Sequence, residues 1–581
     1  MSRIILKPSL SRVFLVGDGF AVSTPELRKV VITHILHIIS KFLHINYFIV
    51  FLFCRIKIEQ MKIMKTPVIL LLLLMFSVGL FATKYYISPV GTSTAAGTIS
   101  APLNFSTAIA KALVAGDSLF IRGGFYSFNS LQQISKSGTS AKRIFIGAYS
   151  GEIPIFDFRT EPYNSSNQGV KLSGNYVHLK GVIIQGAGDN GLQVTGSNNI
   201  IEACTTRWNS DAGTQMKTGS DNLVLNCDSY ENFDYQSGGI AAPDFGGNAD
   251  GFADKQYTNT GSNTFRGCRS WRNSDDGWDS FEKIGNTVYD SCWCYAMSPA
   301  TYDMTDNIRF KTDSASWFYQ FKNAAGRYVM TNYGNGNGFK LGGNYTANNT
   351  TLHNCVAVGN PSKGFDQNNN NGIMTIYNCT SYNNSSNYGF ANSTYGTLII
   401  KNCASLTSKN SNTFNCKTVT QSNNTWNTGF SCATSDFVSL DYTQMLNPRQ
   451  SNGSMPEVTL LHLKATSTMI DKGTNVGFAF NGLAPDLGAY EYANITVTED
   501  ILMLKNNSTS PVYFSATAKE IMVRGSVAAV EVFELSGQKV YSSCNGSEDL
   551  IIPASNMSKG VCLVRVVLAN GVATVYKILL N

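Results

Sequence analysis

The sequence predicts an all-β protein whose main part is a parallel β-solenoid built from three-strand coils. Seven cysteines recur with a period of 24 residues, because their successive gaps are 23, 41, 24, 63, 24 and 24 residues. An apolar or aromatic residue stands three positions before each of these cysteines, and asparagine immediately precedes four of them. Since one coil cannot bury its inner face alone, stacked coils must share a continuous core.

The cysteine column is expected to be a buried ladder rather than a disulfide framework. A strict period suits small apolar side chains, and free cysteine is readily buried. A disulfide remains an open alternative for Cys416 with Cys432, which lie outside the column. The column consists of Cys204, Cys227, Cys268, Cys292, Cys355, Cys379 and Cys403.

Both ends of the solenoid have their own sequence signals. Residues 105–126 offer a short amphipathic helix, a Gly-Asp turn and a strand, and such a helix would cover the open edge of the first coil. The repeats are expected to end near residues 484–492. Beyond a polar linker at 493–500, residues 501–581 alternate apolar and polar positions between Gly turns, which predicts a small β-sandwich.

The N-terminal segment predicts export. Residues 61–82 place two lysines before an apolar run that Ala82 closes, as in a secretory signal peptide, and the run is shorter than the roughly 20 residues of a membrane span. Residues 1–60 show no domain pattern, so we expect them to be an upstream extension assigned to the protein by error. The solenoid domain then covers residues 84–492 of a secreted or cell-surface chain without a stable membrane span.

Charge and composition exclude several function classes. Residues 1–83 hold ten Lys/Arg and three Asp/Glu, a charge of +7, so the formal total of +6 leaves 6 − 7 = −1 for the remainder. A nearly neutral mature chain argues against nucleic-acid binding. Only three histidines lie beyond the leader, which argues against a histidine-rich zinc centre. We expect a monomer.

A second repeated column, built on glycine, carries the chemistry. Its glycines are Gly191, Gly251, Gly277, Gly338, Gly364 and Gly389. Aligning them places Asp250, Asp276 and Asn337 one position before the glycine, and Asp279, Lys340 and Asp366 two positions after it. The gap of 61 residues between Gly277 and Gly338 predicts one coil with a long insertion, at about residues 298–332.

This register gathers Asp250, Asp275, Asp276, Asp279 and Lys340 on neighbouring coils. Carboxylates at that density repel one another unless a cation neutralises them, and hard oxygen ligands suit Ca²⁺. For any single aspartate, a solvated turn is the plain alternative. To serve as a base, Lys340 must be neutral, although its ordinary pKa is about 10.4. A metal would lower that pKa, whereas the carboxylates would raise it.

At these residues the sequence resembles polysaccharide lyase family 9, the pectate lyase type with a right-handed parallel β-helix. The resemblance covers about residues 85–492 and rests on the joint presence of NADGFADK, CRSWRNSDDGWDSFE and NGNGFKLGG. It implies that Asp250, Asp275, Asp276 and Asp279 bind Ca²⁺ and that Lys340 is the catalytic base. The long stretch between Trp278 and Gly338 departs from the simpler family pattern and bears on the shape of the groove.

The resemblance implies β-elimination on a pectic polysaccharide. Ca²⁺ would bridge the aspartates and the C6 carboxylate of a galacturonate, Lys340 would remove the C5 proton, and the bond to O4 would break. Lys255, Arg269 and Arg272 are candidates for pairing with further substrate carboxylates, with surface salt bridges as the alternative. Trp278 is a candidate for stacking on a sugar ring, with a buried ladder position as the alternative.

Three other functions stay open at this point. A rhamnogalacturonan lyase would use the same mechanism on another pectic backbone. A non-catalytic, calcium-dependent glycan-binding solenoid or adhesin would keep the aspartates without needing Lys340. A hydrolase of the polygalacturonase type would need paired carboxylates without Ca²⁺.

The C-terminal module resembles the sorting domain of the type IX secretion system. The resemblance rests on AVEVFELSGQKVY, SKGVCLVRV and the terminal VYKILLN. A generic β-sandwich or a carbohydrate-binding appendage is an equal alternative.

Overall fold

The computed structural model describes residues 82–234, 246–258, 261–296 and 334–492, short pieces at 302–303, 308, 324–326 and 329–330, and most of 512–580. The predictions for residues 1–60, for nearly all of the signal peptide at 61–82 and for the linker at 493–500 lie outside these residues. Within the described part of the chain, no helix is both long enough and apolar enough to span a membrane.

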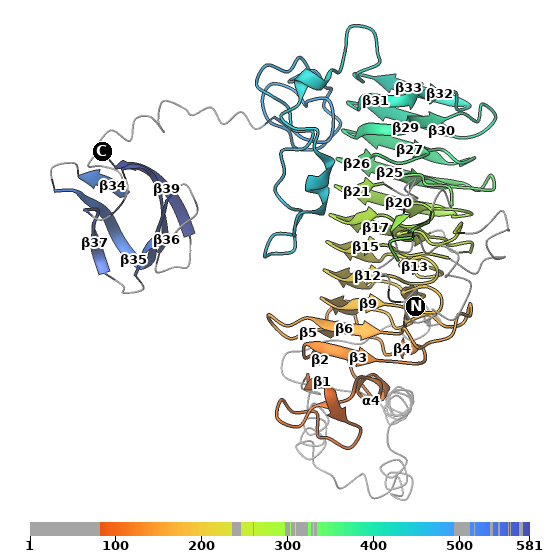
Figure 1. Cartoon of the computed structure of the whole chain (residues 1–581), viewed down its shortest axis with the longest axis horizontal. Helices are drawn as coiled ribbons and strands as arrows, with labels where there is room; N and C mark the ends of the chain where they lie inside the picture. The colour runs from red at the N-terminus through yellow and green to blue at the C-terminus, as the bar shows by residue number, and fades with distance from the viewer. Residues whose placement is uncertain are drawn as a thin grey trace, which may run out of the picture. The chain divides into compact units, whose positions relative to one another are not determined.

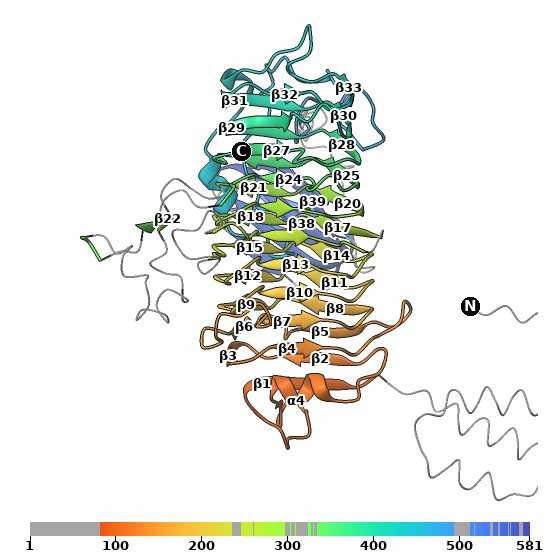
Figure 2. The ribbon, with the colours of Figure 1, turned by 90° about the vertical axis from the view of Figure 1, so that its right-hand side faces the viewer.

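Residues 84–422 form a parallel β-helix, as the cysteine period predicts (Figures 1 and 2). Its first sheet contains β1 (Lys84–Thr92), β2 (Ser118–Ile121), β5 (Ile144–Ala148), β8 (Val177–Lys180), β11 (Ile200–Glu202), β14 (Leu223–Leu225), β17 (Ser262–Arg266), β20 (Gly285–Asp290), β25 (Asn348–His353), β28 (Ile373–Tyr377), β30 (Thr397–Lys401) and β33 (Thr418–Ser422).

Two further columns of parallel strands complete each coil, and they share the long strand β29. The second column contains β3 (Gly124–Ser127), β6 (Pro154–Asp157), β9 (Ile183–Gln185), β12 (Thr205–Arg207), β15 (Asp228–Tyr230), β18 (Arg269–Trp271), β21 (Trp293–Tyr295), β26 (Val356–Val358), β29 (Thr380–Phe390) and β31 (Ala404–Asn410). The third contains β4 (Gln132–Ile134), β7 (Val170–Leu172), β10 (Leu192–Val194), β13 (Thr214–Met216), β16 (Phe252–Asp254), β19 (Trp278–Asp279), β24 (Phe339–Lys340), β27 (Lys363–Asp366), β29 and β32 (Thr413–Phe414).

The cysteine column is a buried ladder, as predicted. Each column cysteine is at most 3% exposed, and a thiol such as Cys268 Sγ donates to the Val224 carbonyl on the preceding coil at 3.4 Å. The asparagine before a cysteine has a left-handed backbone, with φ of 50° at Asn378 and 57° at Asn402. Asparagine tolerates this conformation, which explains its recurrence there. Cys416 and Cys432 are free thiols, so the possible disulfide between them is wrong.

The expected helix at the start of the solenoid is α4 (Phe105–Ala110). The Asn104 side chain caps it by accepting a hydrogen bond from the Thr107 backbone N–H at 2.8 Å. Phe105, Ala108 and Ile109 are buried. The helix lies at the β1 end of the coils, where it covers apolar side chains of the first turn (Figure 2).

The coils end earlier than the sequence analysis predicts. The last ladder strand is β33, which ends at Ser422, whereas the repeats were expected to reach residues 484–492. Residues 424–492 contain only the short 3₁₀ helices η3 (Thr434–Asp436) and η4 (Tyr442–Leu446) and isolated bridges. Their apolar side chains pack on outward-facing residues of the second column, such as Val358 and Leu406, so this segment belongs to the β-helix domain.

A buried ionic cluster fixes this C-terminal segment to the coils. Asp228 Oδ2 lies 2.7 Å from Arg269 Nη2, and Asp228 Oδ1 lies 2.7 Å from Arg449 Nη2. Arg269 Nη1 donates to the carbonyls of Met445 and Asn447 at 3.0 and 2.8 Å. Arg269 is only 5% exposed, so the expectation that it pairs with substrate is wrong. It holds the fold together instead.

We expect Asp228→Asn to destabilise the protein by about 3–5 kcal/mol, because it leaves two buried guanidinium groups without their counter-ion. Arg266→Ala removes the half-exposed pair with Asp290 and is expected to cost less than about 1 kcal/mol.

Burial acts to raise the pKa of Asp228, but Arg269 and Arg449 outweigh it and lower the pKa below 3.8. This stabilisation is therefore complete above about pH 5 and is lost as the pH falls through the lowered pKa. Urea unfolding monitored at two pH values checks both statements, and equal losses in the two variants would contradict the cluster's role.

The C-terminal module, predicted as a small β-sandwich, is an antiparallel β structure with its own apolar core. Its strands are β34 (Val512–Ser515), β35 (Glu520–Glu534), β36 (Lys539–Ser543), β37 (Ser547–Pro553), β38 (Gly560–Leu568) and β39 (Ala573–Leu580). β34 and β37 pair with the first half of β35, while β36 and β38 pair mainly with its second half. Gly525, with φ of 106°, lies near the register shift between the halves. A valine-rich cluster forms the core.

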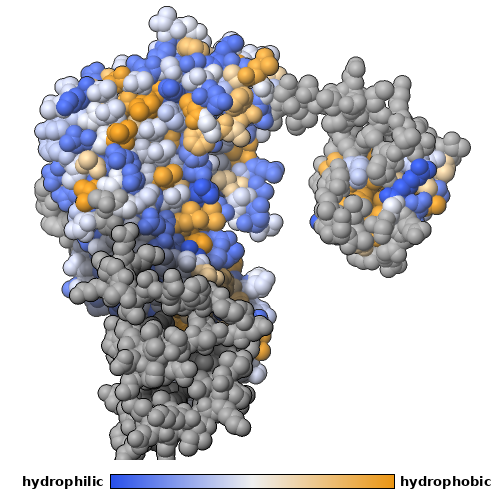
Figure 3. All heavy atoms as spheres, turned by 180° about the vertical axis from the view of Figure 1, so that it is seen from behind, coloured by the Kyte–Doolittle hydropathy of each residue, from blue (hydrophilic) through white to orange (hydrophobic). Residues whose placement is uncertain are grey.

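The two remaining short strands lie within the predicted insertion. β22 (Tyr302–Asp303) pairs antiparallel with β23 (Val329–Met330), and the rest of residues 298–332 lies almost entirely outside the described part of the chain. On the face of the β-helix shown in Figure 3, hydrophilic and apolar residues are interspersed over the coloured atoms. The continuous apolar ladders lie inside the coils.

Candidate active site

The third strand column places the predicted site residues in one row. Asp279 on β19 is the direct partner of Lys340 on β24, and Lys340 is the direct partner of Asp366 on β27. Neighbouring coils are about 4.8 Å apart. The long stretch before Gly338 therefore hides no additional coil, which confirms the predicted register across the insertion.

Strand alternation determines which side chains of this column reach the surface. Trp278 and Phe339 point inward and stack with ring centroids 4.6 Å apart, so the next residues, Asp279 and Lys340, point outward. Trp278 is 0% exposed, and the expectation that it stacks on substrate is wrong.

A Cβ on Gly277 would lie 2.8 Å from Cys294 Sγ, which explains glycine at this position. Gly389 pairs with Asp366 and lies outside the glycine column.

Three of the predicted aspartates converge. Asp250, Asp276 and Asp279 are at most 1% exposed, and one carboxylate oxygen from each lies within 4.8 Å of the other two. Asp276 Oδ1 accepts hydrogen bonds from the Asn337 backbone and side chain at 2.8 and 2.9 Å. Asp276 Oδ2 pairs with the ammonium group of Lys340 at 3.0 Å. We refer to these three residues as the acidic cluster.

The fourth predicted aspartate lies beside the acidic cluster rather than within it. Asp275 is 1% exposed, and its Oδ1 accepts a hydrogen bond from the Asn335 backbone N–H at 2.6 Å. Burial raises the pKa of Asp275 well above its usual value, and the neighbouring charge of Asp276 adds to the shift. Without a cation nearby, the Asp275 carboxyl is therefore protonated far more readily than an ordinary aspartate.

Two lysines share the negative charge of the acidic cluster. Lys340 Nζ lies 3.0 Å from Asp276 Oδ2 and 3.4 Å from Asp279 Oδ1. Lys255 Nζ lies 2.9 Å from Asp250 Oδ2 and 2.8 Å from Asp279 Oδ2. The structure thus brings Lys255 to the acidic cluster, whereas the sequence analysis predicted that it pairs with a substrate carboxylate.

The protonation states follow from this arrangement. Burial raises the pKa of Asp250 to about 7, although Lys255 opposes the shift. Burial acts to raise the pKa of Asp279 as well, but Lys255 and Lys340 outweigh it and lower that pKa. For Lys340, burial acts to lower the pKa, whereas Asp276 and Asp279 raise it well above 10.5. Lys340 is therefore a firmly held ammonium group while the carboxylates beside it are charged.

The donor set fits a hard divalent cation. Three converging carboxylates and a fourth beside them offer oxygen ligands of the kind that Ca²⁺ prefers. No histidine or cysteine takes part in this group, which argues against a zinc site.

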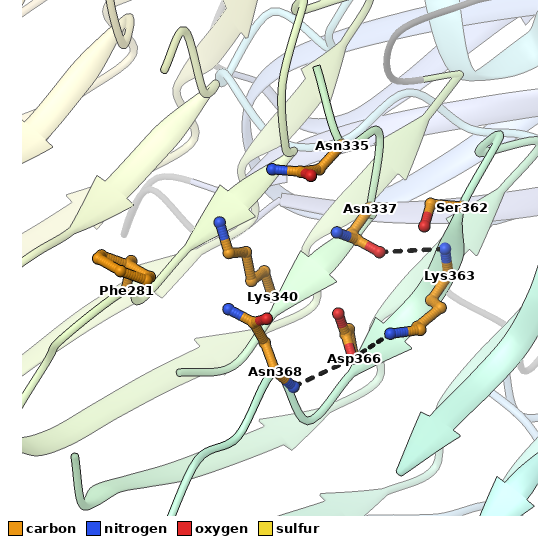
Figure 4. Close-up of a pocket in the computed structure, with 8 residues that line it drawn as sticks. All are labelled: Phe281, Asn335, Asn337, Lys340, Ser362, Lys363, Asp366 and Asn368. Atoms are coloured by element: carbon orange, nitrogen blue, oxygen red, sulfur yellow. Dashed lines mark hydrogen bonds and ion pairs between the residues drawn. The ribbon is translucent and has the colours of Figure 1, made fainter. Parts of the chain in front are cut away.

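A cavity of about 320 Å³ adjoins Lys340 on the side of β27 (Figure 4). Phe281 forms part of its wall, and Lys340 Nζ lies 5.4 Å from the centre of that ring. Lys363 and Asp366 form another part of the wall. The sequence analysis did not single out Lys363, although it stands one position before Gly364, in the same column as Asp250 and Asp276.

Arg272 pairs with Glu231, which follows β15 in the second strand column. Its side chain is 44% exposed at the end of β18, and Nη1 lies 3.5 Å from Glu231 Oε1. Its neighbour Trp271 stacks on Tyr230 with ring centroids 4.3 Å apart. These residues form the outer corner between the second and third columns.

Comparison with known proteins places this site in a family. Residues 85–412 match the family described as Pel9A-like, right handed beta helix region. The chain is 35% identical over 418 residues to pectate lyase L from Dickeya dadantii (strain 3937), covering 70% of this chain and 90% of the relative. It is 32% identical over 320 residues to pectate lyase PEL9 from Emericella nidulans, covering 51% of this chain and 72% of the relative.

Two solved structures share the fold. The crystal structure of pectate lyase Pel9A superposes with a TM-score of 0.59 at 34% identity, covering 71% of this chain and 98% of that one. A structure named rhamnogalacturonan lyase gives a TM-score of 0.54 at 24% identity, covering 66% of this chain and 97% of that one. At that identity the second likeness supports the fold alone.

Proposed function

The chain belongs to the Pel9A-like family of right-handed β-helix proteins and is a polysaccharide lyase of the pectate lyase type. We propose that it cleaves polygalacturonate by Ca²⁺-assisted β-elimination, with Lys340 as the base. The observation that carries this proposal is the register of Lys340 beside Asp279, with its Nζ 3.0 Å from Asp276. Structural calcium binding alone would gain nothing from a lysine at that position.

In this proposal Asp250, Asp275, Asp276 and Asp279 hold the metal. Bound there, Ca²⁺ would withdraw charge from the C6 carboxylate of the substrate and so acidify the proton on C5. Lys340 removes that proton as a neutral amine, the electron pair forms the C4–C5 double bond, and the C4–O4 bond breaks. O4 then takes a proton from water, and Lys340 returns the C5 proton to the hydroxide left behind, so no water is consumed and the neutral amine is restored. The product carries a 4,5-unsaturated uronate at its new non-reducing end.

The charges around Lys340 determine when it can act as a base. With the carboxylates charged, Lys340 is an ammonium group, because Asp276 and Asp279 outweigh the burial that would lower its pKa. Lys340 can act as a base only after those carboxylates are neutralised. Metal dependence is thus expected of the base as well as of substrate binding.

The proposal is tested by ultraviolet absorbance of unsaturated uronate. The full chain is incubated with polygalacturonate and, separately, with rhamnogalacturonan, each with Ca²⁺ and with a chelator. We expect absorbance to rise on polygalacturonate with Ca²⁺ and to remain flat with chelator. A rise on rhamnogalacturonan alone would favour the alternative substrate. New reducing ends without absorbance would indicate a hydrolase and overturn the proposal.

We further propose that the protein is exported and acts as a monomer. Residues 61–82 would serve as the signal peptide, residues 84–492 as the lyase domain, and residues 501–581 as a sorting domain of the type IX system. Arg272 remains a proposed partner of further uronate carboxylates, whereas Lys255 pairs with Asp250 and Asp279. Mass spectrometry of the secreted protein checks the export scheme, since peptides from residues 61–82 would contradict removal of a signal peptide.

A further inference from the structure

The residues one position before the column glycines change charge along the β-helix. Asp250 and Asp276 are acidic, Asn337 on the next coil is neutral, and Lys363 on the coil after that is basic. Hydrogen bonds fix this order, since the Lys363 backbone N–H donates to Asn337 Oδ1 at 3.2 Å. A polymer lying along the coils therefore passes from the acidic cluster to a cation within two coils of about 4.8 Å each.

Lys363 is positioned to act as that cation. Its Nζ lies 2.9 Å from Asp366 Oδ1, and Asp366 also accepts the Asn368 backbone N–H at 3.0 Å (Figure 4). An ammonium group has three donors, and this ion pair occupies one of them. The Lys363 side chain is 38% exposed whereas that of Asp366 is 5% exposed, so the outermost charge of the pair is positive.

The absence of a side chain at Gly389 leaves room for the methylene chain of Lys363, referred to here as its stem. Gly389 on β29 is the strand partner of Asp366 on the following coil. A Cβ added to Gly389 would overlap Lys363 Cδ. The Lys363 stem thus crosses Gly389, and Lys363 lines the cavity that also borders Lys340. This places Lys363 within the same cavity as the proposed base, one coil further from Asp250.

We infer that Lys363 binds the carboxylate of the uronate next to the scissile one and makes the enzyme prefer polygalacturonate to rhamnogalacturonan. The inference rests on the proposed function, which places the scissile uronate over Asp279 and Lys340. The neighbouring sugar then lies over Lys363. Every sugar of polygalacturonate carries a carboxylate, whereas rhamnogalacturonan alternates uronate with neutral rhamnose. A neutral sugar would leave Lys363 without a charged partner.

The test compares Lys363→Met with the unchanged full chain on both polymers in the presence of Ca²⁺. On polygalacturonate we expect KM to rise about tenfold with kcat within about twofold, because one charge-assisted hydrogen bond to bound substrate is lost. On rhamnogalacturonan the rate should stay unchanged. If the unchanged chain does not cleave rhamnogalacturonan, the inference is tested only by comparing the KM of Lys363→Met and of the unchanged chain on polygalacturonate.

Three further variants separate charge from folding. Lys363→Arg keeps the cation and should retain most of the affinity. Gly389→Ala keeps the charge but displaces the stem, and should raise KM by an intermediate factor. Lys401→Ala removes a lysine from β30 in the first sheet and should change nothing. Melting temperatures near that of the unchanged chain would show that the variants fold.

The outcomes distinguish the inference from the proposed function. An unchanged KM in Lys363→Met, or an equal loss on both polymers, would overturn the inference while the lyase assignment stands. If the unchanged chain produced no unsaturated uronate from either polymer, the proposed function would fail and the inference with it.

Discussion

Replacing Lys340 with alanine is expected to lower kcat on polygalacturonate by about 10²–10⁴-fold, the usual contribution of a positioned general base. Ca²⁺ binding should persist or strengthen, because Lys340 Nζ lies 3.0 Å from Asp276 and competes with a metal for that carboxylate. Kinetics and titration calorimetry on the same preparation measure both quantities. Loss of activity together with loss of Ca²⁺ binding would indicate a damaged site rather than a missing base.

Lys340→Arg is the matched control for this experiment. Arginine keeps the positive charge beside Asp276 and Asp279 but does not lose its proton in proteins. It should therefore be as inactive as alanine if Lys340 is a base. If Lys340 only pairs with the substrate carboxylate, arginine should restore much of the rate. An alanine variant that keeps more than about a tenth of the wild-type kcat would also contradict the mechanism.

Replacing Asp276 with asparagine is expected to have the second largest effect. The change keeps the shape of the side chain and its neighbour Asn337 but removes one charge from the acidic cluster. Because carboxylate charge sets calcium affinity, Ca²⁺ binding should weaken, and activity at a fixed Ca²⁺ concentration should fall by about 10²-fold or more. Excess Ca²⁺ should recover part of this loss.

Thermal unfolding gives a readout that does not depend on activity. A metal that binds only the folded protein stabilises it by about 2.7 kcal/mol at a hundred times its Kd, so Ca²⁺ should raise the Tm of the unchanged chain. The rise should be smaller in Asp276→Asn. Asp290→Asn, which alters the half-exposed pair with Arg266, should keep the full rise. A Ca²⁺-induced rise that is the same in all three proteins would rule out the acidic cluster as the metal site.

Periodicity made the fold and most of the site predictable from sequence. The 24-residue cysteine period specified the coils, and the glycine column carried the register across the insertion, so Lys340 was correctly aligned with Asp279. A repeat transmits such information because each coil contacts only its neighbours. The left-handed turns at Asn378 and Asn402 explain in turn why asparagine marks the repeat.

Trp278 differs from the prediction because of strand alternation, and Arg269 differs because its partners are distant in sequence. Trp278 and Asp279 are adjacent on one strand and must face opposite sides, so an outward Asp279 already excludes an exposed Trp278. Arg269 could not be interpreted in that way. Its partners Met445 and Asn447 follow it by 176 and 178 residues, in a segment without repeats, and no local pattern announces such a contact.

The measurement that tests the central claim most directly is the mass of the products from a short saturated oligogalacturonate. Elimination consumes no water, so the two fragments must together have the mass of the substrate, and one of them must carry the C4–C5 double bond. The unchanged chain with Ca²⁺ should give this result, while chelator or Lys340→Ala should leave the substrate intact. Fragments that together exceed the substrate by one water, or unsaturated product formed without Lys340, would contradict β-elimination by this site.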